Sequence, residues 1–118
     1  YVSVHIRTTD FIEHIGKGTD YNLFFSFIDK YKTKKVYLAT DCKEVQTIMK
    51  DKYGDRIFFY RDIENQSLSF GNTNRFTTAE SIYIDIFMCV GSTDFCGTRF
   101  STFSDMIKLL KLYTTKIN

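Results

Sequence analysis

The sequence predicts an α/β fold: a Rossmann-like, three-layer domain with a mostly parallel sheet of about four strands. Short segments rich in β-branched and aromatic residues recur along the chain, and each is followed by a segment whose apolar residues repeat at helical spacing. Strands that alternate with helices in this way pair in parallel through right-handed crossovers. The 118 residues are 43% hydrophobic and 17% aromatic, which indicates one folded domain with its own core.

The first strand and the first helix are predicted within residues 1–31. Residues 1–6 alternate Tyr, Val and Ile with polar residues, as a strand does. A loop is expected over 11–19, which contains two glycines, and Asp20 can cap the helix that follows. The inward face of that helix is expected to carry Leu23, Phe24, Phe27, Ile28 and Tyr31.

The middle of the chain predicts two more strands around a second helix. Residues 36–39 form a short apolar run, typical of a buried strand, which Thr40 and Asp41 end. Residues 43–53 predict a helix that Gly54 stops. Its inward residues are expected to be Val45, Ile48 and Met49. Residues 56–60 predict the third strand, and 61–75 a polar loop.

Two helices and a short strand are predicted in the last third. A helix is expected to begin at Thr77 or Thr78, where Glu80 gives a partial capping box, and to end at 90–91. Residues 94–97 predict the fourth strand, and 101–113 the last helix.

Net charge and sequence pattern argue against nucleic acid and membranes as partners. A net charge of +2 is too small to indicate nucleic acid or an anionic membrane surface. No apolar run approaches the roughly 20 residues of a membrane span, and no signal-peptide pattern opens the chain. The chain starts inside a strand and without Met, so we expect a fragment of a longer protein. The Lys, Asn and Ile content and the cysteines suggest a cytoplasmic protein, with the Golgi lumen as the alternative.

The cysteines and histidines predict neither a disulfide framework nor a metal site. Cys42, Cys89 and Cys96 are odd in number and lack C-x-x-C spacing, so we expect reduced thiols. His5 and His14 form no familiar ligand spacing with Asp, Glu or Cys.

Polar residues gather where the first two predicted strands end. His5 and Arg7 close the first strand, Asp10 follows, and Asp41 leaves the second. Ligands of open parallel sheets bind beyond these carboxyl ends, and Arg carries a planar fork of donors that suits a phosphate or a carboxylate. An ordinary surface ion pair between Arg7 and Asp10 is the alternative interpretation.

The predicted last helix begins with Ser101 and Thr102, next to the same sheet edge. A helix N-terminus presents unbonded N–H groups and the positive end of its dipole, so it holds phosphate well. The alternative for these hydroxyl groups, and for Thr98, is plain N-capping, as it is for Asp41 before the helix at Lys43.

Asp85 interrupts the otherwise apolar run over 82–88. A carboxylate in such a run is paired, solvated at a crevice edge, or reserved for a ligand. Its two oxygens would match the N1–H and exocyclic amine of a guanine, and we favour a functional use.

Several spaced segments resemble the core α1,6-fucosyltransferases and the rhizobial nodulation fucosyltransferases, within a superfamily that includes the protein O-fucosyltransferases. VHIRTTD at 4–10 is similar to their V-H-x-R-[RT]-T-D motif. In the same order follow VYLATD at 36–41, NRFT at 74–77 with IDI at 84–86, and DF at 94–95 with FST at 100–102. The T-T-D ending differs from the R-G-D of the α1,2 group.

The resemblance implies that residues 1–118 are the carboxyl-side, nucleotide-sugar-binding half of a GT-B glycosyltransferase. It implies GDP-fucose as donor, transfer with inversion to a glycan or protein hydroxyl, and neither metal nor cofactor. Arg7 would hold the β-phosphate and stabilise the leaving GDP. His5 and Asp85 would contact guanine, and Asp41 the ribose or nearby loops. The remaining roles would be phosphate contact by Ser101 or Thr102, and positioning of Arg7 or fucose by Asp10.

Two departures leave other functions open. Thr8 stands where the family has its second arginine. Ile15 stands at the position that corresponds to the family's proposed general base, and Glu13 or His14 is close enough to take that role. Thr8 would suit a catalytically degenerate GDP-sugar-binding module. An unrelated Rossmann-like phosphate-binding domain, such as a receiver with Asp41 at a strand end, is a further alternative, although a receiver's acidic pair and late-strand Lys are not seen.

Overall fold

A four-stranded, all-parallel sheet with helices forms the described part of the chain, and the sheet order is β3-β2-β1-β4. The computed structural model describes residues 1–7, 21–63, 79–98 and 101–117. The strands are β1 (Val2–Ile6), β2 (Val36–Thr40), β3 (Ile57–Phe58) and β4 (Phe95–Cys96). The helices are α2 (Tyr21–Lys30), α3 (Lys43–Tyr53), α4 (Ala79–Gly91) and α5 (Thr102–Ile117), with a 3-10 turn at η1 (Gly54–Arg56). The predicted α/β class and parallel sheet are confirmed.

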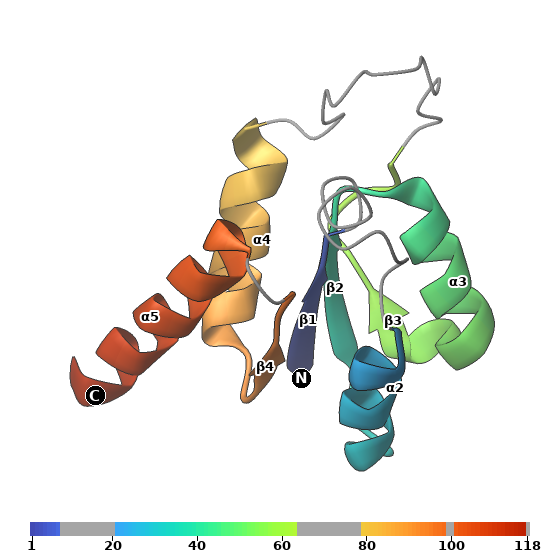
Figure 1. Ribbon diagram of the computed structural model, residues 1–118, viewed down its shortest axis with the longest axis horizontal. Helices are drawn as coiled ribbons and strands as arrows, with labels where there is room; N and C mark the ends of the chain where they lie inside the picture. The colour runs from blue at the N-terminus through green and yellow to red at the C-terminus, as the bar shows by residue number, and fades with distance from the viewer. Residues whose placement is uncertain (8–20, 64–78, 99–100, 118) are drawn as a thin grey trace.

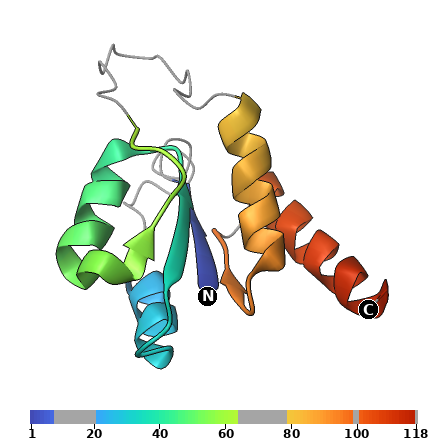
Figure 2. The same cartoon turned by 180° about the vertical axis from the view of Figure 1, so that it is seen from behind.

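The helices cover the two faces of the sheet and give three layers (Figure 1). Helices α2 and α3 pack on one face, where the main core lies; helices α4 and α5 pack on the other. Figure 2 shows the same division from behind. Side chains alternate between the faces of a strand. The main core therefore takes the even-numbered residues of the two central strands: Val2, Val4, Ile6, Val36 and Leu38.

The face under α4 and α5 is more polar. Its buried apolar residues are Tyr37, Ala39, Cys89 and Ile107. β1 contributes Ser3 and His5 to this side, and the Ser3 hydroxyl lies 2.7 Å from that of Ser92. The side of β1 that carries His5 is therefore held to its helices largely by hydrogen bonds.

Most predicted helix faces are confirmed, with two corrections. Phe24 and Ile28 of α2 are buried, but Leu23 is 48% exposed, so its predicted place in the core is wrong. The reason is that α2 meets the sheet along a narrow i, i+4 stripe, from which Leu23 is turned away. In α3, Val45 and Met49 are buried, and so is Gln46, which the apolar pattern did not predict.

Element ends differ modestly from the predictions. The third and fourth strands are shorter than predicted, α5 continues to Ile117, and Gly54 ends α3 with a φ of 60°. The cap at Asp20, the loops over 11–19 and 64–75, and the helix start at Thr77 or Thr78 lie outside the described residues.

Cys42, Cys89 and Cys96 are all thiols, and burial raises the pKa of Cys89 to about 12. Within the described ranges, the helices are too short or too polar to cross a membrane.

The strand order places a topological switch beside β1. The chain moves outward from β1 to β2 and β3, and then returns to the opposite side of β1 to form β4. In open α/β sheets, ligands bind at such a switch, beyond the carboxyl ends of the strands.

Candidate functional site

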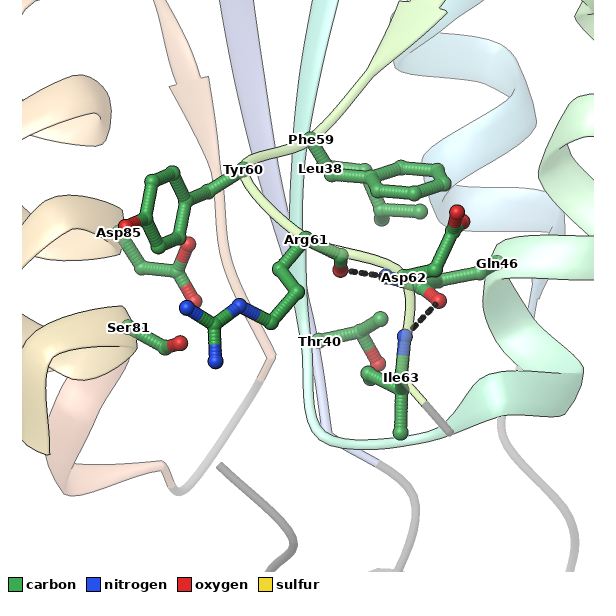
Figure 3. Close-up of a pocket in the computed structure, with 10 residues that line it drawn as sticks. All are labelled: Leu38, Thr40, Gln46, Phe59, Tyr60, Arg61, Asp62, Ile63, Ser81 and Asp85. Atoms are coloured by element: carbon green, nitrogen blue, oxygen red, sulfur yellow. Dashed lines mark hydrogen bonds between the residues drawn. The ribbon is translucent and has the colours of Figure 1, made fainter. Parts of the chain in front are cut away.

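Two adjoining hollows open at the carboxyl edge of the sheet. The inner hollow, of about 390 Å³, lies at the ends of β1 and β2 and is lined by His5, Arg7, Thr40, Asp41, Ile82, Asp85 and Phe103. The outer hollow, of about 360 Å³, lies at the ends of β2 and β3 (Figure 3). It is lined by Leu38, Thr40, Gln46, Phe59, Tyr60, Arg61, Asp62, Ile63, Ser81 and Asp85. Thr40 and Asp85 line both hollows, which therefore adjoin at these two residues.

The first turn of α5 fixes the ring of His5. Its Nδ1 lies 2.6 Å from the Ser104 hydroxyl oxygen, and its ring centroid lies 4.5 Å from that of Phe103. The same Ser104 oxygen accepts the backbone N–H of Thr98 at 3.0 Å. His5 is 7% exposed, so this contact orients a buried ring at the wall of the inner hollow.

The exit of β1 is tied to the chain that follows β4. The Thr98 hydroxyl donates to the His5 carbonyl at 2.8 Å and accepts the backbone N–H of Arg7 at 3.0 Å. Thr98 thus has a structural role, and it aims the half-buried Arg7 side chain at the inner hollow.

Asp85 projects from α4 toward β2. The Tyr37 hydroxyl donates to one Asp85 carboxylate oxygen at 2.5 Å. Burial raises the pKa of Asp85 to about 6, and the bond from Tyr37 works in the opposite direction. The carboxylate is therefore largely ionised at pH 7, at the boundary between the two hollows.

Asp41 is buried at the wall of the inner hollow, one residue before the N-cap of α3. The N-cap position belongs to Cys42, whose side chain makes no capping bond. Thr40 serves the local backbone instead: its hydroxyl donates to the Ile6 carbonyl at 2.6 Å and accepts the Cys42 N–H at 3.3 Å. The N-cap position thus lies one residue after Asp41, the residue to which the alternative interpretation assigned it.

Ser101 caps α5, as the N-capping alternative predicted. The buried Ser101 hydroxyl oxygen accepts the Ser104 N–H at 3.3 Å, and Thr102 is exposed on the first turn. Neither residue lines the inner or the outer hollow. Asp10 and Glu13, which the sequence also singles out, lie outside the described residues.

The structure thus brings together His5, Arg7, Asp41 and Asp85 from three separate segments of the chain. It adds residues that the sequence analysis missed: Phe103 and Ser104 beside His5, Tyr37 beside Asp85, and Arg61 in the outer hollow. Of these, Arg61 had a signal in the sequence, because it follows the third strand much as Arg7 follows the first.

A scan of protein-family models and a search of curated proteins give no match to this sequence. Among the described residues, no three His, Cys, Asp or Glu side chains gather as a metal site would require.

Proposed function

We propose that this chain is the GDP-fucose-binding half of a two-domain GT-B glycosyltransferase, which transfers fucose with inversion and without metal to a glycan or protein hydroxyl. One observation supports the proposal most. His5, Arg7, Asp41 and Asp85, which come from three separated motif-like segments, line one hollow at the carboxyl edge of a parallel sheet. Convergence of these residue types at this edge suits a nucleotide.

Arg7 is the proposed partner of the diphosphate. The inner hollow lies by the switch beside β1, and Phe103 of the first turn of α5 lines it, so the positive end of that helix is close. A guanidinium on the β-phosphate stabilises the negative charge that develops as the C1–O bond of fucose breaks and GDP leaves. Thr102 lines neither hollow but is exposed at the start of α5, so it is a second proposed contact for a phosphate that extends out of the inner hollow.

Asp85 is the proposed reader of the base. An ionised carboxylate accepts the guanine N1–H and the exocyclic amine together, whereas adenine lacks that donor pair. His5 is proposed to contact the base from the inner hollow, and Asp41 the ribose or nearby loops.

The acceptor hydroxyl attacks C1 on the face opposite GDP and loses its proton, which gives inversion. Asp10 and Glu13 are the proposed groups for positioning fucose and for taking that proton, with His14 as the alternative to Glu13.

The test is a calorimetric titration of the chain with GDP, GDP-fucose and guanosine. Binding of both nucleotides, weak binding of guanosine, and loss of GDP binding in Arg7→Ala but not in Lys32→Ala would support the proposal. Lys32 is an exposed cation between α2 and β2, remote from the carboxyl edge. Absence of GDP binding to the unchanged chain would refute it.

A catalytically degenerate module is the second candidate, because Thr8 removes one cation from the family pattern. Hydrolysis of GDP-fucose by a protein that contains both halves, lost in Arg7→Ala, would favour the enzyme. Tight GDP binding without transfer or hydrolysis would favour the module.

A further inference from the structure

The outer hollow contains a guanidinium that the proposed function does not use. Arg61 follows β3, and its side chain extends across the hollow toward Ser81 and Asp85 on α4 (Figure 3). Asp85 also lines the inner hollow, so Arg61 and Arg7 lie on two sides of the same carboxylate.

The backbone of Arg61 is fixed, and its exposed side chain lies beside an aromatic ring. The buried Gln46 side chain donates to the Arg61 carbonyl at 3.1 Å and accepts the Ile63 N–H at 2.9 Å, which fixes the backbone (Figure 3). The guanidinium carbon lies 5.5 Å from the centroid of the Tyr60 ring, and the Tyr60 hydroxyl donates to Glu80 of α4 at 2.5 Å. Tyr60 therefore lies between the Arg61 guanidinium and the first turn of α4.

The wall of the outer hollow presents a hydrogen-bond acceptor and a donor fork next to each other. Guanine has the matching pattern, since its N1–H and 2-amino donors adjoin its O6 and N7 acceptors. This pattern favours a base that lies against Asp85 and extends into the outer hollow, beside the phosphates that the proposed function places in the inner hollow.

We propose that Arg61 is a specificity-determining residue that donates to O6 and N7 of guanine while Asp85 accepts the N1–H and 2-amino protons. This inference rests on the proposed function and adds a second reader to its binding site. A guanidinium in that place also rejects adenine, whose 6-amino group is a donor where O6 is an acceptor.

The test compares GDP with 7-deaza-GDP, in which a C–H group replaces N7, by calorimetric titration. The unchanged chain is expected to bind 7-deaza-GDP about tenfold more weakly than GDP, because one of two guanidinium bonds is lost. Arg61→Met keeps the aliphatic stem and removes the donors, so it is expected to bind both nucleotides with the same, reduced affinity. Lys32→Met is the matched control and is expected to keep the tenfold preference.

Two results would overturn the role of Arg61 without touching the proposed function, provided that GDP still binds and Arg7→Ala still abolishes binding. One is equal affinity of the unchanged chain for GDP and 7-deaza-GDP. The other is an Arg61→Met chain that loses affinity for both nucleotides yet retains the tenfold preference, which would assign Arg61 to the phosphates. If GDP does not bind at all, both proposals are wrong.

Discussion

Replacing Asp85 with Asn should make the chain more stable and a poorer binder of GDP. Asn has almost the same shape and still accepts the hydrogen bond from the Tyr37 hydroxyl, which is 2.5 Å long in the native chain. What changes is the charge. The pKa of Asp85 is raised from 3.8 to about 6 in the fold, so the ionised carboxylate opposes folding at neutral pH.

The magnitudes follow from that shift and from the lost bonds. A rise of about two pKa units corresponds to about 3 kcal/mol against the ionised form. The new amide needs donor partners of its own, so we expect a net gain of about 1 to 2 kcal/mol in the free energy of unfolding at pH 7. An Asn oxygen replaces only one of two charge-assisted bonds to guanine, which predicts about 100-fold weaker GDP binding.

Thermal unfolding and calorimetric titration on the same samples measure both effects. Asp51→Asn, an exposed carboxylate on α3, is the control and should change neither. The opposite signs are the informative part. If Asp85→Asn lowers the melting temperature and leaves GDP affinity intact, the carboxylate is a structural partner of Tyr37 and the base-reading role is wrong.

Three further outcomes are expected. Because the pKa of Asp85 is about 6, GDP affinity should fall as the pH drops through about 6, whereas the contribution of this group to stability should rise. The hydrogen bond from Tyr37 holds that pKa down, so in Tyr37→Phe the pH midpoint of GDP binding should move above 6. A midpoint that stays fixed would contradict the assignment. Gly97→Ala would place a Cβ 2.6 Å from the Ser104 Cβ, so it should cost about 1 to 3 kcal/mol and weaken GDP binding by displacing the first turn of α5; unchanged melting and affinity would count against this coupling. Lys111→Met removes a donor to the Cys89 and Val90 carbonyls at the end of α4 and to the Ser92 carbonyl just after it, so it should lower the melting temperature without changing GDP affinity.

The sequence predicts an element well where its apolar periodicity and the residue that ends it mark the same bounds. Helix α3 has the predicted bounds, because its apolar stripe and Gly54 mark them. The prediction is weakest for β3 and β4, each two residues long, since such short strands are defined by pairing with distant residues rather than by local pattern. Leu23 shows the same limit, because an apolar residue becomes core only if a neighbouring layer reaches it.

Some residues of the candidate site could be predicted from the sequence, and others could not. His5, Arg7 and Asp41 could be predicted to lie together, because the carboxyl ends of parallel strands share one edge. Arg61 obeys the same rule, and only its distance from any motif-like segment left it unnoticed. The partnership between His5 and Ser104 could not be predicted, since the two residues are 99 positions apart and meet only through the docking of α5.

The docking of α5 makes the candidate site depend on the layer formed by α4 and α5, which is the less apolar of the two helical layers. Against α2 and α3, the sheet buries a large aliphatic core, and such an interface tolerates small rearrangements. Against α4 and α5, β1 presents Ser3 and His5, which bond to Ser92 and Ser104 at 2.7 and 2.6 Å. Hydrogen bonds have strict distance and direction, so the Ser92 contact fixes the end of α4 and the Ser104 contact fixes the first turn of α5. Because His5 lines the inner hollow, substitutions in this polar layer should alter nucleotide affinity at a smaller loss of stability than substitutions in the aliphatic core.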